Sequence, residues 1–140
     1  MRRFLMMVAF LATLLVGCFG HQQVQVHVAD SMAEAANAAL PILVQTFKLE
    51  GREAIAEAKT EQEARQAIQA IEEKWKPVWD AWEALRIAED AWATALEQGS
   101  DERAALAAVR KAYCGLVAQW PESVPAIPLA PIVCKGTGHE

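Results

Sequence analysis

The sequence predicts an all-α fold, in which three long, kinked helices form an antiparallel bundle that is followed by a Pro-rich C-terminal strap. The main observation is the stretch from Ile68 to Leu96, where apolar residues recur at alternating steps of three and four over four heptads. Trp79 widens this apolar stripe, so at least two further helices are needed to cover it. Alanine is abundant from Ala29 to Ala118, and the alternating residues 24–28 have no second strand to pair with.

The first helix has two possible starts. One lies near Val24, and the other is a capping box in which Ser31 is followed three residues later by Glu34. We expect this helix to end near Lys59 and to bend at Pro41, because proline removes a backbone hydrogen bond from the helix interior.

The second helix is expected to begin at Thr60, which forms a second capping box with Glu63, and to run to about Gln98. Gly99 is typical of the left-handed residue that follows a helix. Pro77 and the proline of the first helix are equally far from the turn between the two helices. The sequence therefore predicts that both helices bend together at one height.

The third helix is expected to start with Ser100 as its cap and to stop before Pro121. Because the turn before it is short, the second and third helices must be antiparallel neighbours. Residues equally far from that turn then face each other, which places Leu85 opposite Tyr113 or Cys114.

The N-terminus has the features of an export signal. Arg2 and Arg3 precede an uncharged run, Phe4 to Val16, that is shorter than the roughly 20 residues of a membrane-spanning helix. The residues Leu15-Val16-Gly17-Cys18 then resemble the lipobox of bacterial lipoproteins. This resemblance covers residues 1–18 only, and it implies a signal peptide at 1–17, a lipidated Cys18 and a polar tether at 18–23.

Two other readings of this segment also lead to export. An ordinary signal peptidase could cut after Gly20, or an uncleaved anchor could end near Phe19. In Gram-negative lipoproteins an aspartate after the cysteine tends to retain the protein at the inner membrane. Phe19 stands there in this chain, so the resemblance points to the periplasmic face of the outer membrane.

Charge argues against a nucleic-acid partner. Removal of residues 1–17 leaves 11 basic and 18 acidic residues, a net charge of −7 with neutral histidines. Nucleic-acid binding needs a basic surface, and an acidic protein is not attracted to anionic lipid headgroups either. The membrane partner is therefore expected to be reached through the N-terminal lipid alone.

The remaining domains are the helical bundle at 24–120 and the strap and tail at 121–140. In the strap, Pro125, Pro128 and Pro131 follow Pro121 with the period of a polyproline II helix, and apolar residues lie between them. With Cys18 assigned to lipid, an oxidising compartment would join Cys114 to Cys134. A strap closed by this disulfide explains the segment better than a free ligand for a peptide-binding groove.

The sequence offers little for catalysis. His21, His27 and His139 lack the spacing of a metal site, and no cofactor is expected. There is no Gly-rich phosphate loop, nucleophile elbow or spare thiol, so we expect a non-enzymatic protein.

Aromatic residues and one acidic residue lie on the predicted seams. The tryptophans could form a ligand cage, but their helical spacing favours core packing; they are Trp75, Trp79, Trp82, Trp92 and Trp120. Glu89 is the only charged residue on the seam of the second helix, where an unpaired carboxylate is costly. We expect a structural polar layer in which Glu89 pairs with Arg110 opposite or with Arg86 one turn back.

Two classes of function are compatible with these expectations. The first is a lipid-anchored binding, interaction or structural module of the cell envelope, with an envelope protein or a cell-wall component as its partner. The second is a phage or prophage lipoprotein that acts in host lysis or in superinfection exclusion. The Pro-rich end loosely resembles that of outer spanin subunits, although these are usually short and extended.

Overall fold

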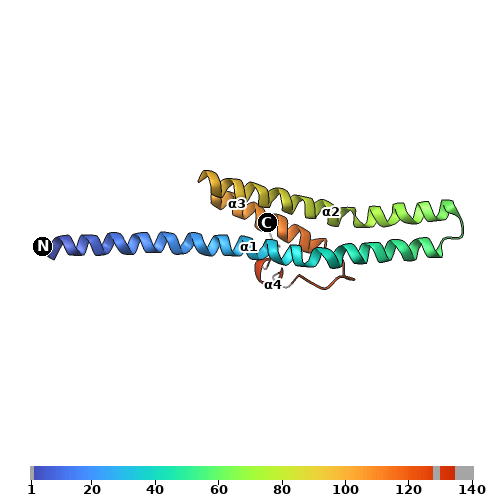
Figure 1. The fold of residues 1–140 in the computed structure, drawn as a ribbon, viewed down its shortest axis with the longest axis horizontal. Coiled ribbons are helices and arrows are strands. Elements are labelled where there is room, and N and C mark those ends of the chain that lie inside the picture. The colour runs from blue at the N-terminus through green and yellow to red at the C-terminus, as the bar shows by residue number, and fades with distance from the viewer. Residues whose placement is uncertain (1, 128–129, 135–140) are drawn as a thin grey trace.

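A computed structural model of the 140-residue chain describes the backbone of residues 2–127 and 130–134, and side chains from residue 27 onwards. The residues so described form four helices in this order: α1 (Arg2–Glu57), α2 (Glu61–Gln98), α3 (Glu102–Ala118) and α4 (Ala130–Val133). The described part of the chain contains no strand. Helix α2 turns back along α1 and α3 turns back along α2, which confirms the antiparallel three-helix bundle (Figure 1).

The turn between α1 and α2 is fixed by the predicted capping box. The backbone N–H of Glu63 donates to Thr60 Oγ1 at 3.1 Å, and Glu63 Oε2 accepts from the backbone N–H of Lys59 at 2.7 Å. One amide of the first turn of α2, and the amide of the residue that precedes its N-cap Thr60, therefore gain side-chain acceptors, which stabilises the start of this helix.

The turn between α2 and α3 differs from the prediction by one residue. Gly99 has the expected left-handed conformation, with φ 60° and ψ 29°. The cap of α3, however, is Asp101 and not Ser100, because Asp101 Oδ1 accepts from the backbone N–H of Ala104 at 3.1 Å. Aspartate also places negative charge at the positive end of the helix dipole, which a serine cannot do.

The start of α1 is the largest departure from the sequence-based expectation. The helix is continuous from Arg2, so neither a start near Val24 nor one at Ser31 is correct, and residues 18–23 are helical rather than a tether. Ser31 lies inside the helix, and its hydroxyl donates to the carbonyl of His27 at 2.7 Å. No proline interrupts residues 2–40, so each added residue extends an existing helix without a new nucleation cost.

Pro41 and Pro77 both lie inside their helices, at equal distances from the α1–α2 turn. Each proline lacks the amide hydrogen of one helical hydrogen bond. The two helices nevertheless continue side by side beyond these positions (Figure 1). A shared bend at this height stays a prediction.

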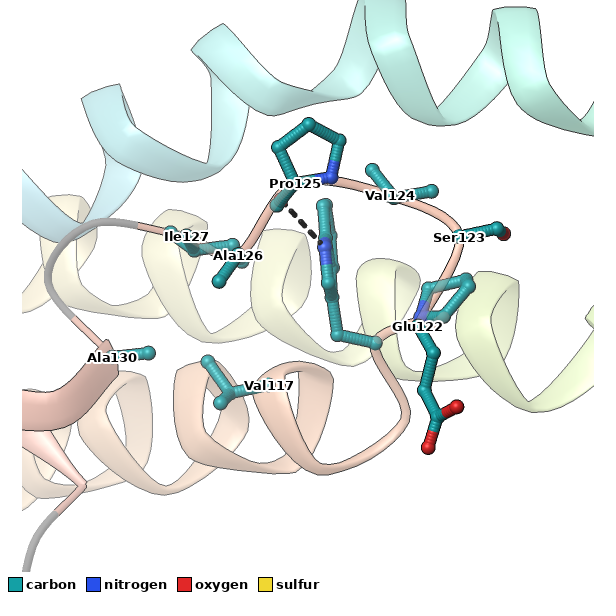
Figure 2. A pocket seen from close by; sticks show the side chains of 10 residues that line it. Val117, Glu122, Ser123, Val124, Pro125, Ala126, Ile127 and Ala130 are labelled. Carbon is teal, nitrogen blue, oxygen red and sulfur yellow. Dashed lines mark hydrogen bonds between the residues drawn. The ribbon is translucent and has the colours of Figure 1, made fainter.

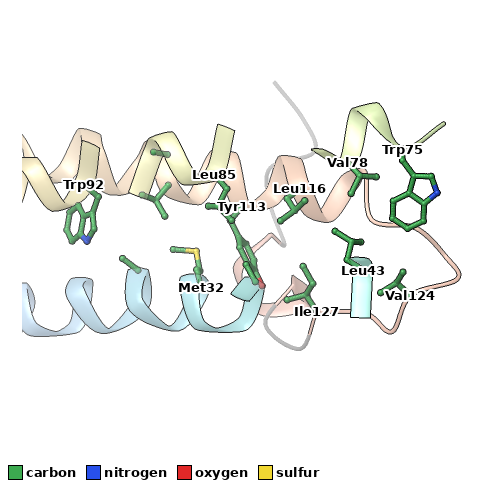
Figure 3. Close-up of a cluster of buried hydrophobic side chains, with 14 residues drawn as sticks. Met32, Leu43, Trp75, Val78, Leu85, Trp92, Tyr113, Leu116, Val124 and Ile127 are labelled. Atoms are coloured by element: carbon green, nitrogen blue, oxygen red, sulfur yellow. The ribbon is translucent and has the colours of Figure 1, made fainter. Parts of the chain in front are cut away.

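The core forms where α1, α2, α3 and the strap meet (Figure 3). Leu85 and Tyr113 lie at the same height in it, as predicted from their equal distances to the Gly99 turn. Leu43 of α1 and Ile127 of the strap are also buried, so all four segments contribute. The largest fully buried side chains are Trp75, Tyr113, Met32, Leu43, Leu85, Leu116, Ile127 and Val109.

Candidate functional site

The C-terminal strap is closed as the cysteine count predicts. Cys114 of α3 and Cys134 form a disulfide, with their Cα atoms 5.5 Å apart. The strap does not continue to this bond as a polyproline II helix, because residues 130–133 form the short helix α4. The strap is thus bound covalently to α3 through Cys134.

Apolar and polar contacts hold the strap against the bundle. Val124 and Ile127 are 5% and 2% exposed and belong to the core. The indole N–H of Trp120 donates to the carbonyl of Pro125 at 3.0 Å, which fixes the first bend of the strap (Figure 2). Burial of these two side chains removes apolar surface from water, which holds the strap on the bundle. The strap is therefore not a free tail.

A groove of about 590 Å³ lies between the strap and the end of α3 (Figure 2). Val117, Val124 and Ile127 line its apolar wall, and Trp120 lines the groove as well. Glu122 and Ser123 are its polar residues. This lining suits apolar contacts and offers few groups for acid–base chemistry.

The polar layer of the bundle is built on Glu50 of α1. Its Oε2 accepts from Lys74 Nζ at 2.7 Å and from the indole N–H of Trp75 at 2.9 Å. The hydrogen bond from Lys74 lowers the pKa of Glu50, and hydrogen bonds from Trp75 and from Ser123 of the strap act in the same direction. This one carboxylate thereby connects α1 and α2.

The polar layer predicted around Glu89 is wrong in its partner Arg110. Arg110 Nε and Nη2 donate to the carbonyl of Val133 at 3.0 and 2.8 Å. Val133 is the last residue of α4, where the carbonyl has no partner within the helix, so Arg110 caps this helix. Equal distance from the turn does not determine the direction in which the side chain of Arg110 points.

Glu89 itself is half-buried and has no ion pair or hydrogen bond among the described residues. Loss of water raises the pKa of Glu89, and the charge of Arg86 only partly opposes this rise. Arg86, the alternative partner, therefore acts on Glu89 from a distance and without a direct contact.

The tryptophans divide between buried and half-buried positions. Trp75 and Trp92 are 1% and 5% exposed, whereas Trp79, Trp82 and Trp120 are half-buried and pack against the core. Phe47 lies edge-on to both Trp75 and Trp79, at centroid distances of 5.5 and 5.7 Å. Trp75 and Trp92 are therefore core residues, whereas the other three tryptophans keep part of their surface exposed.

Two buried donors in the core lack an acceptor among the described residues. They are the indole N–H of Trp92 and the hydroxyl of Tyr113. Burial also raises the pKa of Tyr113, so its hydroxyl keeps its proton. Neither group lines the strap groove, and a neutral phenol enclosed by Met32 and Leu85 has no access to a substrate (Figure 3).

A second groove lies on the outer face of α2 and α3. It has a volume of about 650 Å³ and is lined mostly by alanines, with Ile87 and Lys111 at its edges. Ile87 is 63% exposed, which is high for an isoleucine in the middle of a helix. The apolar pattern of α2 does not predict this face, because its alanines lie outside the more apolar seam.

Sequence reasoning also missed Glu50. Equal distance from the α1–α2 turn pairs Glu50 with Gln69, more than one helical turn from Lys74 and Trp75. Long side chains lean towards the N-terminus of their own helix, which brings Glu50 of α1 and Trp75 of the antiparallel α2 together. If the register between α1 and α2 had allowed for this lean, it would have predicted the contact between Glu50 and Trp75.

The structure gives no further chemical centre in the part that it describes. No group of three or more His, Cys, Asp or Glu side chains could hold a metal ion there. Within the same residues, no helix is both long and apolar enough to cross a bilayer. The side chain of Cys18, the predicted lipidation site, lies outside the described side chains.

Comparison of the chain with protein-family models, curated proteins and solved structures found no match.

Proposed function

We propose that this protein is an exported, lipid-anchored and non-enzymatic module of the cell envelope, and that its helical bundle binds or organises an envelope partner. The observation that carries this proposal is the Cys114–Cys134 disulfide, which fastens the strap over the core. Structural disulfides persist in oxidising compartments and are rare in the cytosol. The third cysteine, Cys18, then stands where a lipobox requires it.

The length of α1 supports a role that extends away from a membrane. From Cys18 to Glu57 this helix covers about 60 Å at 1.5 Å per residue. The N-terminus and the α1–α2 turn lie at opposite ends of the molecule (Figure 1). A lipid on Cys18 would therefore leave the bundle and its strap available to a partner in the periplasm.

The phage alternative has less support. Outer spanin subunits, which the Pro-rich end loosely resembles, are usually short and extended. Here residues 121–127 fold back on the bundle, with Val124 and Ile127 in the core. The strap therefore acts as part of a folded domain, which favours the envelope module over a lysis protein.

Metabolic labelling with a palmitate analogue tests this proposal. The wild-type chain, expressed in a Gram-negative host, should carry the label and fractionate with the outer membrane, whereas Cys18→Ser should carry none. Cys114→Ser with Cys134→Ser is the matched control, because it removes two cysteines and keeps the lipobox; it should still be labelled. Label on Cys18→Ser, or an unlabelled wild type, would refute the lipid anchor.

A further inference from the structure

The outer groove of α2 and α3 and the exposed Ile87 beside it form a self-complementary surface. Ala108, Lys111, Ala112 and Gly115 line the α3 side of the groove. These positions are spaced as i, i+3, i+4 and i+7, which are the four corners of a hole that accepts a knob in helix packing. Three of the four corners carry small side chains, so this hole has room for a branched side chain.

Ile87 is a knob of suitable size, and it lies at the height of this hole. Ile87 precedes Gly99 by as many residues as Ala112 follows Ser100, so the two lie at about the same height of the hairpin. In its own chain Ile87 is 63% exposed and fills no hole. A two-fold axis parallel to the helices leaves the height of each residue along the bundle unchanged. It would therefore bring Ile87 of a second copy to the hole around Ala112.

From these observations we infer that the outer face of α2 and α3 is a homodimer interface, in which α2 of each copy packs antiparallel on α3 of the other. The four helices would form a second bundle on the side of the α2–α3 pair that is remote from α1. Because the knob and the hole lie on one patch, the interface is isologous and closes as a dimer. This inference goes beyond the proposed envelope role and does not depend on the lipid.

Charge at the edges of the groove is complementary in this arrangement. Ile87 is flanked on α2 by the exposed carboxylates of Glu83 and Asp90, which have no ion pair among the described residues. Lys111, a corner of the hole on α3, is exposed as well. A second copy that places Ile87 in the hole also brings Asp90 to the ammonium group of Lys111.

The area is sufficient for a specific but reversible dimer. Helix α3 has 17 residues, so the two-helix face is about 25 Å long and about 20 Å wide, and the pair would bury about 1,000 Å² in total. That is near the lower limit for specific interfaces. We therefore expect a dimer that dissociates on dilution and not a permanent one.

The test measures the mass of the full-length protein in detergent by sedimentation or by light scattering, over a range of concentrations. The wild type should be a dimer at high concentration and should dissociate as it is diluted. Ile87→Glu should weaken the dimer at least 100-fold. Its matched control is Ile132→Glu, which changes an isoleucine that is 75% exposed on α4 and should leave dimerisation unchanged.

A charge exchange separates the interface from a folding defect. Lys111→Glu should weaken the dimer about tenfold, and the further change Asp90→Lys should restore it. A wild type that is monomeric at every concentration would overturn the inference, and would leave the groove to a different protein. A dimer that survives both Ile87→Glu and Lys111→Glu would also overturn it, because association must then use another surface, such as the apolar N-terminus.

Discussion

Glu50 and Glu89 are both half-buried acidic side chains on helices of the bundle, yet their surroundings move their pKa values in opposite directions. Hydrogen bonds from Lys74 and Trp75 lower the pKa of Glu50. Loss of water raises the pKa of Glu89. A carboxylate with donors stabilises the fold when it is ionised, whereas one without donors destabilises it.

Glu50→Ala should lower the free energy of unfolding by about 2 kcal/mol at pH 7, because it leaves the buried indole N–H of Trp75 without an acceptor. The contribution of Glu50 is present above its unfolded pKa, near 4.5, and is lost as the pH falls through its lower folded pKa. Urea denaturation at several pH values measures it. Glu53→Ala, on the exposed side of α1, should cost less than about 0.5 kcal/mol. Equal losses for the two variants would contradict this account of Glu50.

Glu89→Gln should stabilise the protein at pH 7, by less than about 1 kcal/mol, because the amide avoids burial of an unpaired charge. For an acid whose folded pKa is raised, ionisation favours the unfolded state, so the penalty is removed as the pH falls through the folded pKa. The advantage of Glu89→Gln should therefore disappear in acid. Glu72→Gln, on the exposed side of α2, is the control and should change little. A loss of stability in Glu89→Gln at pH 7 would indicate that its carboxylate has a favourable partner.

At the scale of elements, the strap behaves as a fourth component of the bundle. It has no long helix of its own, and it is held by two core residues, by the Trp120–Pro125 hydrogen bond, by Arg110 at the end of α4 and by the disulfide. Its contribution to stability can be separated into packing and covalent closure.

Packing is tested by two isoleucines of this segment. Ile127→Ala should lower the free energy of unfolding by about 2–4 kcal/mol, because it leaves a cavity in the core. Ile132→Ala changes a side chain that is 75% exposed and should cost less than about 0.5 kcal/mol. Similar costs for the two variants in chemical denaturation would mean that the strap is not part of the folded core.

Covalent closure is tested by reduction. The disulfide joins residues 20 apart in the sequence, and the loss of such a crosslink costs about 3 kcal/mol, or about 10 °C in Tm for a domain of this size. Thermal unfolding with and without a reductant measures this difference. A chain with Cys114→Ser and Cys134→Ser should unfold at the Tm of the reduced wild type and should not respond to the reductant. An unchanged Tm on reduction of the wild type would show that the strap is held by packing alone.

The sequence predicted those elements that local chemistry determines. Thr60 with Glu63 and Gly99 marked helix ends correctly because caps use residues close together in the chain. The prediction failed where the outcome depends on the direction in which a side chain points, or on competition between a helix start and a helix that continues. Arg110 contacts the carbonyl of Val133 and not Glu89, and Ser31 has the chemistry of a cap but lies inside a helix that already continues from Arg2. Glu50 was missed because its partners come from another helix and lean towards it.

At the scale of the whole molecule, the three cysteines have separate roles in the proposed function. Cys114 and Cys134 close the strap, and Cys18 would hold the chain at the membrane through lipid. Both modifications require export, so they should occur on the same molecules. A chain that stays in the cytosol should have neither.

Mass spectrometry of the protein purified from the cell envelope tests this central claim most directly. Without reduction, the intact mass should correspond to a chain that begins at Cys18, carries lipid on that residue and has lost two hydrogens to the disulfide. Peptide mapping should join Cys114 to Cys134. A mass that retains residues 1–17, an unmodified Cys18, or free thiols at both Cys114 and Cys134 would contradict the account.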